Sequence, residues 1–406
     1  MSASWPIKRL GDLCELITKG TTPTSVGYSF VPDGINFVKV ESISVGGQFI
    51  ESKFAHIEEN CHNALRRSQL RPGDILFSIA GALGRTAFVT EDIVPANTNQ
   101  ALAIIRLKQS NDVFPAFVLK ALETGFMLEQ IEKFKGGVAQ QNLSLAQVQE
   151  FHIPLPPLPE QQRIVGILDQ AFDDIATAKA NAEKNLQNAR ALFESHLQSV
   201  FTLRGDGWVE KSLGDIAEVK GGKRVPKGYK LLTEPTEYPY LRVTEFTDHG
   251  SIDTSDLRYV SAEVRKQIKN YVIYSTDLYI SIAGTIGKTG IIPKELDGAN
   301  LTENACRLVF REGINNHFVY YFTLTPSFIE QAGLHTRTAA QPKLALSRLS
   351  TINLGIPSFS EQERLADKFD ALRAETQRLE SLYQRKLAAL DALKQSLLHQ
   401  AFSGAL

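Results

Sequence analysis

The sequence contains little cysteine and lacks the residue patterns from which extracellular frameworks, metal sites and membrane spans are built. Its three cysteines, Cys14, Cys61 and Cys306, are far apart and form no Cys-x-x-Cys pair, which argues against a disulfide framework or a zinc site. The start, MSASWPIKRLGDL, has no apolar signal core, and no apolar run reaches the ~18–20 residues of a membrane span. We therefore expect a cytoplasmic protein that does not contact a membrane.

An excess of charge of either sign is also missing. The 406 residues carry a formal net charge of −1, and 43% of them are hydrophobic and 22% charged. This composition is ordinary for a soluble globular protein, and the length allows two or three domains. A nucleic-acid surface would have to arise from local clustering of basic residues.

No catalytic motif is complete. The chain has no Asn/Asp-Pro-Pro-Tyr methyltransferase motif, no nuclease carboxylate cluster and no assignable Ser/His/Asp set. Cys61-His62 lacks further ligands nearby, so we interpret it as structural or surface. The segment GTIGKT (284–289) resembles the end of a phosphate-binding P-loop, but the first glycine of that motif would fall at Ile282.

The same near-miss occurs twice. DILFSIAGALGRT (74–86) matches DLYISIAGTIGKT (277–289), with Arg85 in the place of Lys288 and Ile79 at the missing glycine. We interpret the pattern as a repeated structural hairpin whose glycines allow a tight turn, while its cation could reach a phosphate. An ATP-using enzyme built on GTIGKT is the alternative.

The repeat extends over nearly the whole chain. LGDLCE (10–15) recurs as LGDIAE (213–218), ANTNQA (96–101) recurs loosely as ANLTENA (299–305), AQQNL (139–143) recurs as AQPKL (340–344), and the segment from 153 to 164 recurs around 357–365. A period of about half the chain is too long for a solenoid and indicates a duplicated domain.

Each repeat has a globular part and a helical part. Frequent turn signals and short β-type runs predict an α/β (α+β) fold with a curved, mostly antiparallel sheet over 1–155 and 204–357. Proline followed by Glu160 or Glu361, and then no proline for about 40 residues, predicts long helices over 156–203 and 358–406.

Both predicted helices carry an apolar stripe at spacings of three and four. They are either two separate core helices or a pair that packs antiparallel as a coiled coil, and their matched length favours the pair. A helix of ~40 residues spans about 60 Å, so such a pair would be a spacer with a related globular part at each end and a pseudo-two-fold axis. Duplex DNA is a long, periodic ligand that suits such a spacer.

At this point the residues resemble a known family. The segment LPPLPEQQRIVGILD, the twofold repeat and the Leu-Gly-Asp start of each globular part resemble the specificity subunit of type I restriction–modification enzymes. The resemblance covers essentially the full chain, although the second helix start, IPSFSEQE, is looser. It implies two target recognition domains that read a split, asymmetric DNA site, and helices that set the unread gap and dock partner subunits.

The resemblance also implies the partners and where the chemistry lies. Two modification subunits would carry S-adenosylmethionine and methylate adenine, and two restriction subunits would use ATP and Mg²⁺, so this chain would hold no cofactor and catalyse nothing. The helix starts are the expected docking or helix-start residues: Glu160, Gln161, Arg163, Glu361, Gln362 and Arg364. A non-DNA adaptor that joins two proteins through its helices is the remaining alternative.

Candidate DNA contacts are the side chains that favour phosphates or base edges. They lie in two Gly-bearing loops, a second basic cluster interpreted as a helix face, the repeated hairpin and the loops before the long helices: Lys19, Thr21, Thr22, Thr24, Arg66, Arg67, Arg85, Gln140, Gln141, Lys220, Lys223, Arg224, Lys227, Lys230, Arg258, Arg265, Lys266, Lys269, Lys288 and Lys343. For the Gly-bearing loops and the second basic cluster, a solvated surface loop or an ordinary charged face is the alternative. The loops before the long helices either touch DNA or buttress the helix starts. Because the globular parts differ outside the shared motifs, the expected target is not a palindrome.

Overall fold

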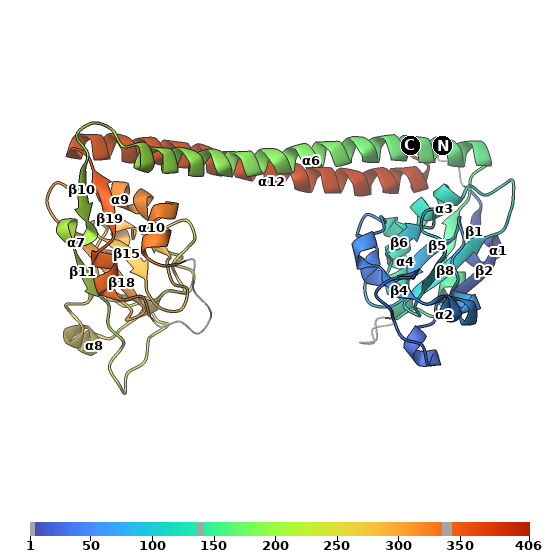
Figure 1. The fold of residues 1–406 in the computed structure, drawn as a ribbon, viewed down its shortest axis with the longest axis horizontal. Coiled ribbons are helices and arrows are strands. Elements are labelled where there is room, and N and C mark those ends of the chain that lie inside the picture. The colour runs from blue at the N-terminus through green and yellow to red at the C-terminus, as the bar shows by residue number, and fades with distance from the viewer. Residues whose placement is uncertain (1–4, 136–141, 335–342) are drawn as a thin grey trace. The chain divides into compact units, whose positions relative to one another are not determined.

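The structure is a computed structural model that describes residues 5–135, 142–334 and 343–406. The chain falls into two compact units. Unit 1 comprises Met1–Glu183 with Arg385–Leu406, and unit 2 comprises Lys184–Gln384. Each unit combines a globular part of short strands and helices with portions of two long helices (Figure 1).

The described part of unit 1 contains three small sheets. The largest is antiparallel, in the order β2 (Cys14–Lys19), β8 (Leu102–Leu107), β5 (Ile75–Ser78), β6 (Thr86–Phe88). In the second, β3 (Ile35–Val38) has an antiparallel and a parallel neighbour, β4 (Ala55–Ile57) and β7 (Ala96–Thr98). The third pairs β1 (Ile7–Arg9) with β9 (His152–Pro154). Because side chains alternate along a strand, Ile75 and Phe77 enter one apolar cluster and Leu76 enters another.

Short helices complete unit 1: α1 (Leu10–Leu13), α2 (Glu59–Ala64), α3 (Pro115–Leu122), α4 (Gly125–Lys135) and α5 (Leu145–Gln149). Helix α3 buries Phe117 and Val118 against the main sheet. The same cluster contains Ile164 and Leu168 of the first long helix and Leu398 of the second. The long helices are therefore part of the core of this unit.

Unit 2 repeats the strand order of unit 1. Its main antiparallel sheet is β11 (Ala217–Gly221), β18 (Ala305–Phe310), β15 (Leu278–Ser281), β16 (Thr289–Gly290). The second sheet is β13 (Arg258–Tyr259), β12 (Pro239–Leu241), β17 (Ala299–Leu301), β14 (Val272–Ile273), with β12 and β17 parallel. The third pairs β10 (Val209–Ser212) with β19 (Asn353–Ile356). The repeat read from the sequence is thus a repeat of topology.

Helices occupy matching places in unit 2: α7 (Leu213–Ile216), α8 (Ala262–Gln267), α9 (Asn316–Thr323), α10 (Pro326–Gln331) and α11 (Leu346–Ser350). Helix α9 buries Phe318 and Tyr321 against the main sheet. Phe201 of the first long helix and Phe369 of the second lie in the same cluster, with their rings stacked at 6.0 Å. Each unit therefore uses one globular helix to attach its sheet to both long helices.

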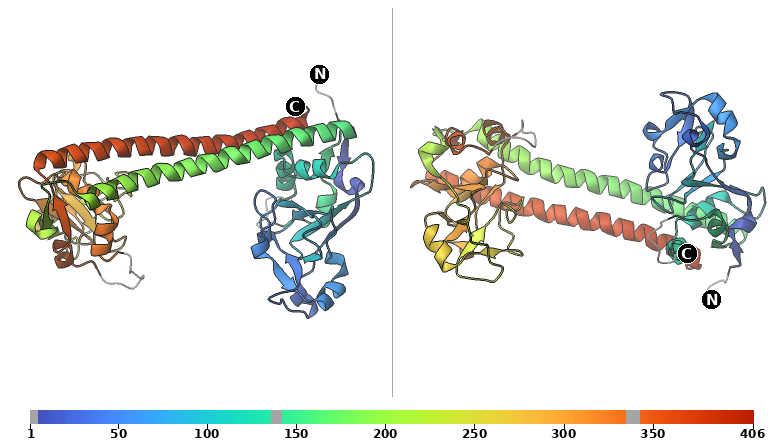
Figure 2. Two further views of the ribbon diagram at one scale, coloured as in Figure 1. Left: turned by 45° about the horizontal axis from the view of Figure 1, so that its top comes forward. Right: turned by 90° about the horizontal axis from the view of Figure 1, so that it is seen from below.

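The long helices are α6 (Leu158–Leu203, 46 residues) and α12 (Phe359–Ser403, 45 residues). Within each unit they lie side by side and antiparallel (Figures 1 and 2). In unit 1, Lys179 pairs with Asp391 at 2.7 Å while Arg163 reaches the Leu406 carbonyl at 3.0 Å. In unit 2, Arg190 pairs with Glu380 at 2.9 Å.

These observations confirm the predicted α+β class, the internal repeat and the antiparallel pair of long helices. The expectation of one curved sheet per globular part was wrong in detail. The strands are only two to six residues long, and turns carry the chain between separate sheets. Within the described ranges, no helix is long and apolar enough to cross a membrane, and no group of three or more His, Cys, Asp or Glu residues could hold a metal ion.

Candidate nucleic-acid interface

The SIAG segment forms the same hairpin in both units. Glycines with φ of +76° and +80° in unit 1, and of +74° and +96° in unit 2, turn the chain between two strands. The Gly84 N–H donates to the Ser78 carbonyl at 3.0 Å, and the Gly287 N–H donates to the Ser281 carbonyl at 2.9 Å. A P-loop leads from a strand into a helix, whereas this segment leads from β15 into β16. The structure therefore supports the interpretation as a hairpin.

The hairpin cations are occupied inside their own units. Arg85 donates to the Ile43 carbonyl at 2.9 Å, and Lys288 donates to the Phe246 carbonyl at 2.8 Å. Lys288 also pairs with Asp248 at 2.9 Å. A structural role accounts for both cations, and their contact with a phosphate stays a prediction.

A buried ion pair lies in the main sheet of each unit. Asp74 binds Arg106 through two hydrogen bonds of 2.7 Å, and Asp277 binds Arg307 at 2.6 Å. The hydrogen bonds that Arg106 donates to Asp74 raise the pKa of Arg106. The sequence comparison found the shared aspartates but not their partners, because each arginine lies about 30 residues further along the chain.

The two Gly-bearing loops occupy equivalent places. Gly loop 1 (residues 19–25) follows β2 and lies against turn 1 (98–102), while Gly loop 2 (219–230) leaves β11 and lies against turn 2 (301–305). The backbone N–H groups of Gly20 and Gly222 donate to the Leu102 and Ala305 carbonyls at 3.3 and 2.9 Å. A Cβ at either glycine would lie 2.0–2.1 Å from a turn carbonyl oxygen, so only glycine permits this approach.

Acidic side chains from outside Gly loop 2, or beside it, offset part of the positive charge of the loop. Arg224 binds Glu303 of turn 2 at 2.5 Å, and Lys220 pairs with Glu218 at 2.8 Å. Burial alone would raise the pKa of Glu303, but the hydrogen bonds from Arg224, its own backbone and Thr302 outweigh burial and lower it. The exposed Lys227 and Lys230 form no ion pair with another described residue.

The structure gathers several of the predicted side chains around Gly loop 2. Lys343 donates to the Glu303 carbonyl, Lys223 lies over the Tyr271 ring at 5.6 Å, and Tyr229 donates to Glu263 of α8. In unit 1, Thr22 binds Gln100 of turn 1, and Arg67 donates to the Thr18 hydroxyl at 3.5 Å. Lys19 and Thr24 are exposed, Thr21 is half-buried, and Gln140 and Gln141 lie outside the described residues.

The predicted basic helix face is not one face. Arg265 and Lys266 belong to α8, but Lys269 follows its end, Arg66 and Arg67 lie in the 3-10 turn Arg66–Ser68, and Arg258 lies on β13. The sequence predicted a longer helix face than exists, because α8 ends at Gln267, after less than two turns. Arg265 donates to the Asn300 side-chain oxygen at 3.1 Å. At the corresponding place in unit 1, Nδ1 of His62 forms a hydrogen bond of 2.5 Å with the Asn97 side-chain oxygen.

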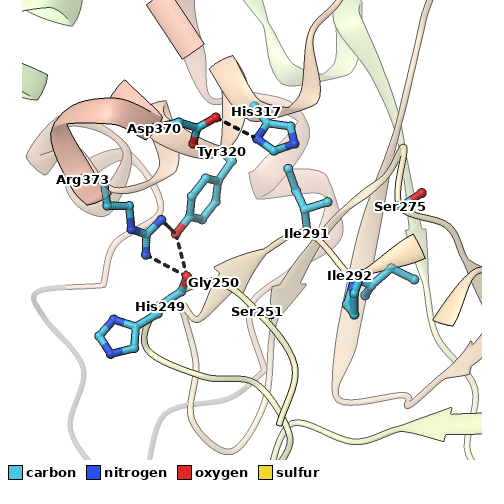
Figure 3. A pocket seen from close by; sticks show the side chains of 11 residues that line it. His249, Gly250, Ser251, Ser275, Ile291, Ile292, His317, Tyr320, Asp370 and Arg373 are labelled. Atoms are coloured by element: carbon cyan, nitrogen blue, oxygen red, sulfur yellow. Dashed lines mark hydrogen bonds and ion pairs between the residues drawn. The ribbon is translucent and has the colours of Figure 1, made fainter. Parts of the chain in front are cut away.

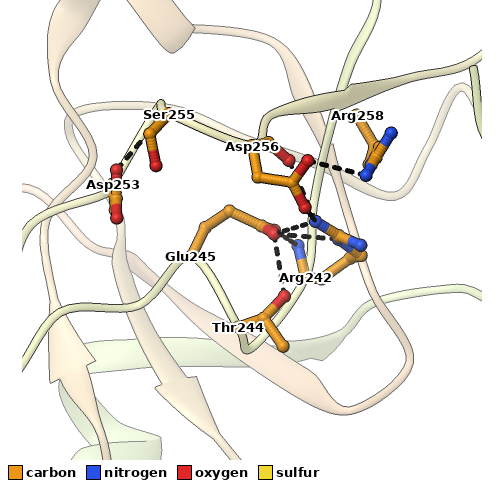
Figure 4. A network of polar contacts seen from close by, with 7 residues as sticks. All are labelled: Arg242, Thr244, Glu245, Asp253, Ser255, Asp256 and Arg258. Atoms are coloured by element: carbon orange, nitrogen blue, oxygen red, sulfur yellow. Dashed lines mark hydrogen bonds and ion pairs between the residues drawn. The ribbon is translucent and has the colours of Figure 1, made fainter. Parts of the chain in front are cut away.

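Arg258 is held in a polar network of its own (Figure 4). It pairs with Asp256 at 2.6 Å, and Asp256 also pairs with Arg242 at 3.1 Å. Arg242 in turn binds the buried Glu245. Two acidic side chains thus neutralise the two arginines, which makes Arg258 a weaker candidate for DNA contact than the exposed lysines of Gly loop 2.

The helix-start residues divide into two kinds. Gln161 and Gln362 are buried. Their side-chain amides bind the backbone of the segment before α3 and α9, respectively, as well as the carbonyl of the proline five residues before them. They are helix-start residues and offer no surface to a partner. The exposed Arg163 and Arg364 bind Glu160 and Glu361 at 2.7 Å, and these hydrogen bonds lower the pKa of both glutamates.

A pocket of about 460 Å³ in unit 2 was not foreseen (Figure 3). Its wall joins α12 to the loop between β12 and β13: Arg373 donates to the His249 carbonyl at 2.7 Å and to the Tyr320 hydroxyl at 2.6 Å (Figure 3). On the other side, Tyr321 donates to Asp370 at 2.5 Å. A single arginine within a helical stripe gave no signal for these contacts, because its partners lie 53 and 124 residues away.

Comparison with known proteins identifies the family. The model of the type I restriction modification DNA specificity domain matches residues 3–186 and 205–386. The chain is 23% identical to the type I restriction enzyme EcoBI specificity subunit of Escherichia coli, over 96% of this chain and 84% of that protein. It is also 23% identical to the putative MjaX specificity subunit of Methanocaldococcus jannaschii, over 91% and 86%.

Solved structures share the fold. A chain from work on complex assembly and conformational transition of the type I R-M system has a TM-score of 0.81 at 20% identity, and the match covers 100% of this chain and 99% of that one. The HsdS subunit from Thermoanaerobacter tengcongensis has a TM-score of 0.64 at 20% identity, over 100% and 98%. With two matching domains, the chain belongs to the family of type I restriction–modification specificity subunits.

Proposed function

We propose that this chain reads a split, asymmetric DNA target, with one half-site for each globular part. One observation supports this most strongly. Both units hold the Gly loops and turns in the same backbone arrangement, yet the side chains there are Thr22 and Gln100 in one unit and Arg224 and Glu303 in the other. A shared framework with different polar side chains suits two readers of different sequences.

The long helices would set the gap between the half-sites and dock the partner subunits. These would be two modification subunits carrying S-adenosylmethionine and, through them, two restriction subunits using ATP and Mg²⁺. The exposed Glu160–Arg163 and Glu361–Arg364 pairs are available for docking, whereas Gln161 and Gln362 act by fixing the helix starts. The chain itself would recognise DNA in the cytoplasm and catalyse no reaction.

Salt dependence of duplex binding tests the proposal against the adaptor alternative. The chain, assembled with its modification subunits, is titrated with duplex DNA over a range of salt concentrations. Neutralised phosphates give a negative slope of log K against log[salt], and each lost phosphate contact reduces the slope by about one. We expect Lys227→Gln with Lys230→Gln to reduce it by about two, and Lys211→Gln, on exposed β10, to leave it unchanged. An assembled complex without salt-dependent binding would support an adaptor.

A further inference from the structure

Turn 1 and turn 2 place one residue of each unit opposite its Gly loop. The Ile79 N–H donates to the Ala101 carbonyl, and the Ile282 N–H donates to the Asn304 carbonyl, at 2.9 and 2.8 Å. Since these carbonyls correspond, the residues just before them, Gln100 and Glu303, correspond as well. The positions are therefore aligned by hydrogen bonds and not only by sequence.

The Gly loops align in the same way. The Thr21 N–H donates to the Thr98 carbonyl at 3.1 Å, and the Lys223 N–H donates to the Leu301 carbonyl at 2.8 Å. The next residues, Thr22 and Arg224, therefore correspond. Each of them binds the turn residue of its own unit, Thr22 the Gln100 amide oxygen and Arg224 the Glu303 carboxylate. A matched side-chain pair thus occupies the same place in both units, neutral in unit 1 and charged in unit 2.

Stability does not explain the charged pair. The Arg224 side chain is 79% exposed and that of Glu303 is 24% exposed. Exposed ion pairs contribute little to folding, because water and salt screen them. The carboxylate is also unsuited to contact phosphates, which it repels. It binds Arg224, and Lys343 donates to the backbone carbonyl of the same residue. An acidic group beside a basic loop is better suited to a base edge.

The two pairs match different base pairs. In the major groove, guanine presents two acceptors that an arginine fork binds, and its cytosine presents an amino donor that a carboxylate accepts. Arg224 and Glu303, side by side, offer both groups. Adenine presents one acceptor and one donor, which a glutamine amide binds twice, and thymine adds a methyl group that threonine can contact. Thr22 and Gln100 offer this second set.

We infer that Thr22 with Gln100, and Arg224 with Glu303, are specificity-determining pairs for an A·T pair in one half-site and a G·C pair in the other. This inference rests on the proposed function, since it requires that the Gly loops enter the DNA groove. It assigns base contact to two turn residues, Gln100 and Glu303, that local charge did not single out. The lysines of Gly loop 2 then position the DNA through phosphates without reading it.

Exchanging the pairs tests the inference. Each variant is co-expressed with the modification subunit in a host free of adenine methylation, and modified adenines are mapped. The double change Arg224→Thr with Glu303→Gln should convert one G·C position to A·T, with a change in preference of about ten- to one-hundred-fold. The other half-site and the gap should stay the same. Thr22→Arg with Gln100→Glu should alter one position of the other half-site from A·T to G·C.

Controls separate the possible failures. Lys227→Thr, in the same exposed loop, should lower methylation at all sites without changing the motif. If the double variant does not assemble, the near-isosteric Glu303→Gln alone should relax the preference at the same position. A motif that stays unchanged in assembled, active exchange variants overturns the inference while leaving the proposed function intact. A wild-type complex that methylates no motif contradicts the proposed function itself.

Discussion

Replacing Gln161 with alanine should destabilise unit 1 far more than the same change at Gln162, the next residue of α6. The Gln161 amide is buried, accepts from the Phe114 N–H and donates to the Asp112 and Pro156 carbonyls, each at 2.8 Å. Alanine leaves three backbone groups, one buried and two partly buried, without these partners, and an unpaired buried group costs about 1–3 kcal/mol. Because the site can relax, we expect a net loss of about 2–4 kcal/mol in the free energy of unfolding.

The chain provides a reporter for this measurement. Trp5 packs against the core of unit 1 and Trp208 against that of unit 2, and they are the two tryptophans of the sequence. In a Trp208→Phe background, urea unfolding followed by fluorescence reports on unit 1. With an m-value of about 2–3 kcal/mol/M, Gln161→Ala should lower the midpoint by about 1 M. The exposed Gln162→Ala should change the free energy by less than about 0.5 kcal/mol.

A Gln161→Ala midpoint no lower than that of Gln162→Ala would contradict this expectation. Water would then satisfy the three backbone groups as well as the Gln161 amide does. The second repeat offers an independent repetition, since Gln362 binds the Asn315 N–H and the Gly313 and Pro357 carbonyls. Gln362→Ala against the exposed Glu363→Ala, read from Trp208 in a Trp5→Phe background, should show the same difference.

Three further substitutions are each compared with a control variant or with the wild type. Asp277→Asn leaves Arg307 buried and unpaired and should cost about 3–5 kcal/mol in urea unfolding, whereas Asp248→Asn, 84% exposed, should cost less than about 1 kcal/mol; equal losses would contradict the burial argument. Gly250 and Gly298 both have a positive φ, +69° and +83°, but a Cβ at 250 would lie 2.2 Å from the Tyr320 hydroxyl, whereas a Cβ at 298 would meet nothing within 4 Å. The melting temperature of Gly250→Ala should therefore fall below that of Gly298→Ala. We expect equilibrium dialysis to find no ATP bound to the wild type or to Lys288→Met. ATP binding to the wild type that Lys288→Met abolished would instead support a P-loop.

The sequence predicted those features that recur locally. The SIAG hairpins, the topological repeat and the bounds of α6 and α12 follow from the spacing of glycines, apolar residues and prolines, which act on neighbouring residues. The division of each globular part into three sheets did not follow, since the strands are too short to reveal their partners by alternation.

The surroundings of the candidate site residues could be predicted less well than the fold, because part of them comes from distant segments. Gly loop 2 contains no acid in its own sequence, yet Glu303 binds Arg224 from 79 residues away. Arg258 and the α8 cations looked like one basic face until β13 placed Arg258 beside Asp256. The charge that decides the role of Arg224 thus lies on a distant segment, which composition along the chain does not reveal. Asp256 lies only two residues before Arg258, but this ion pair becomes apparent only once Arg258 is placed on β13 and not on a helix face.

The measurement that tests the central claim most directly is a methylome of the wild-type complex. The chain is co-expressed with its modification subunit in a host that lacks adenine methylation, and modified adenines are mapped across the genome. We expect a single split, non-palindromic motif whose two halves are separated by a fixed gap. An unmodified genome, with both proteins soluble and associated, would contradict DNA recognition and leave a protein that only joins its partners.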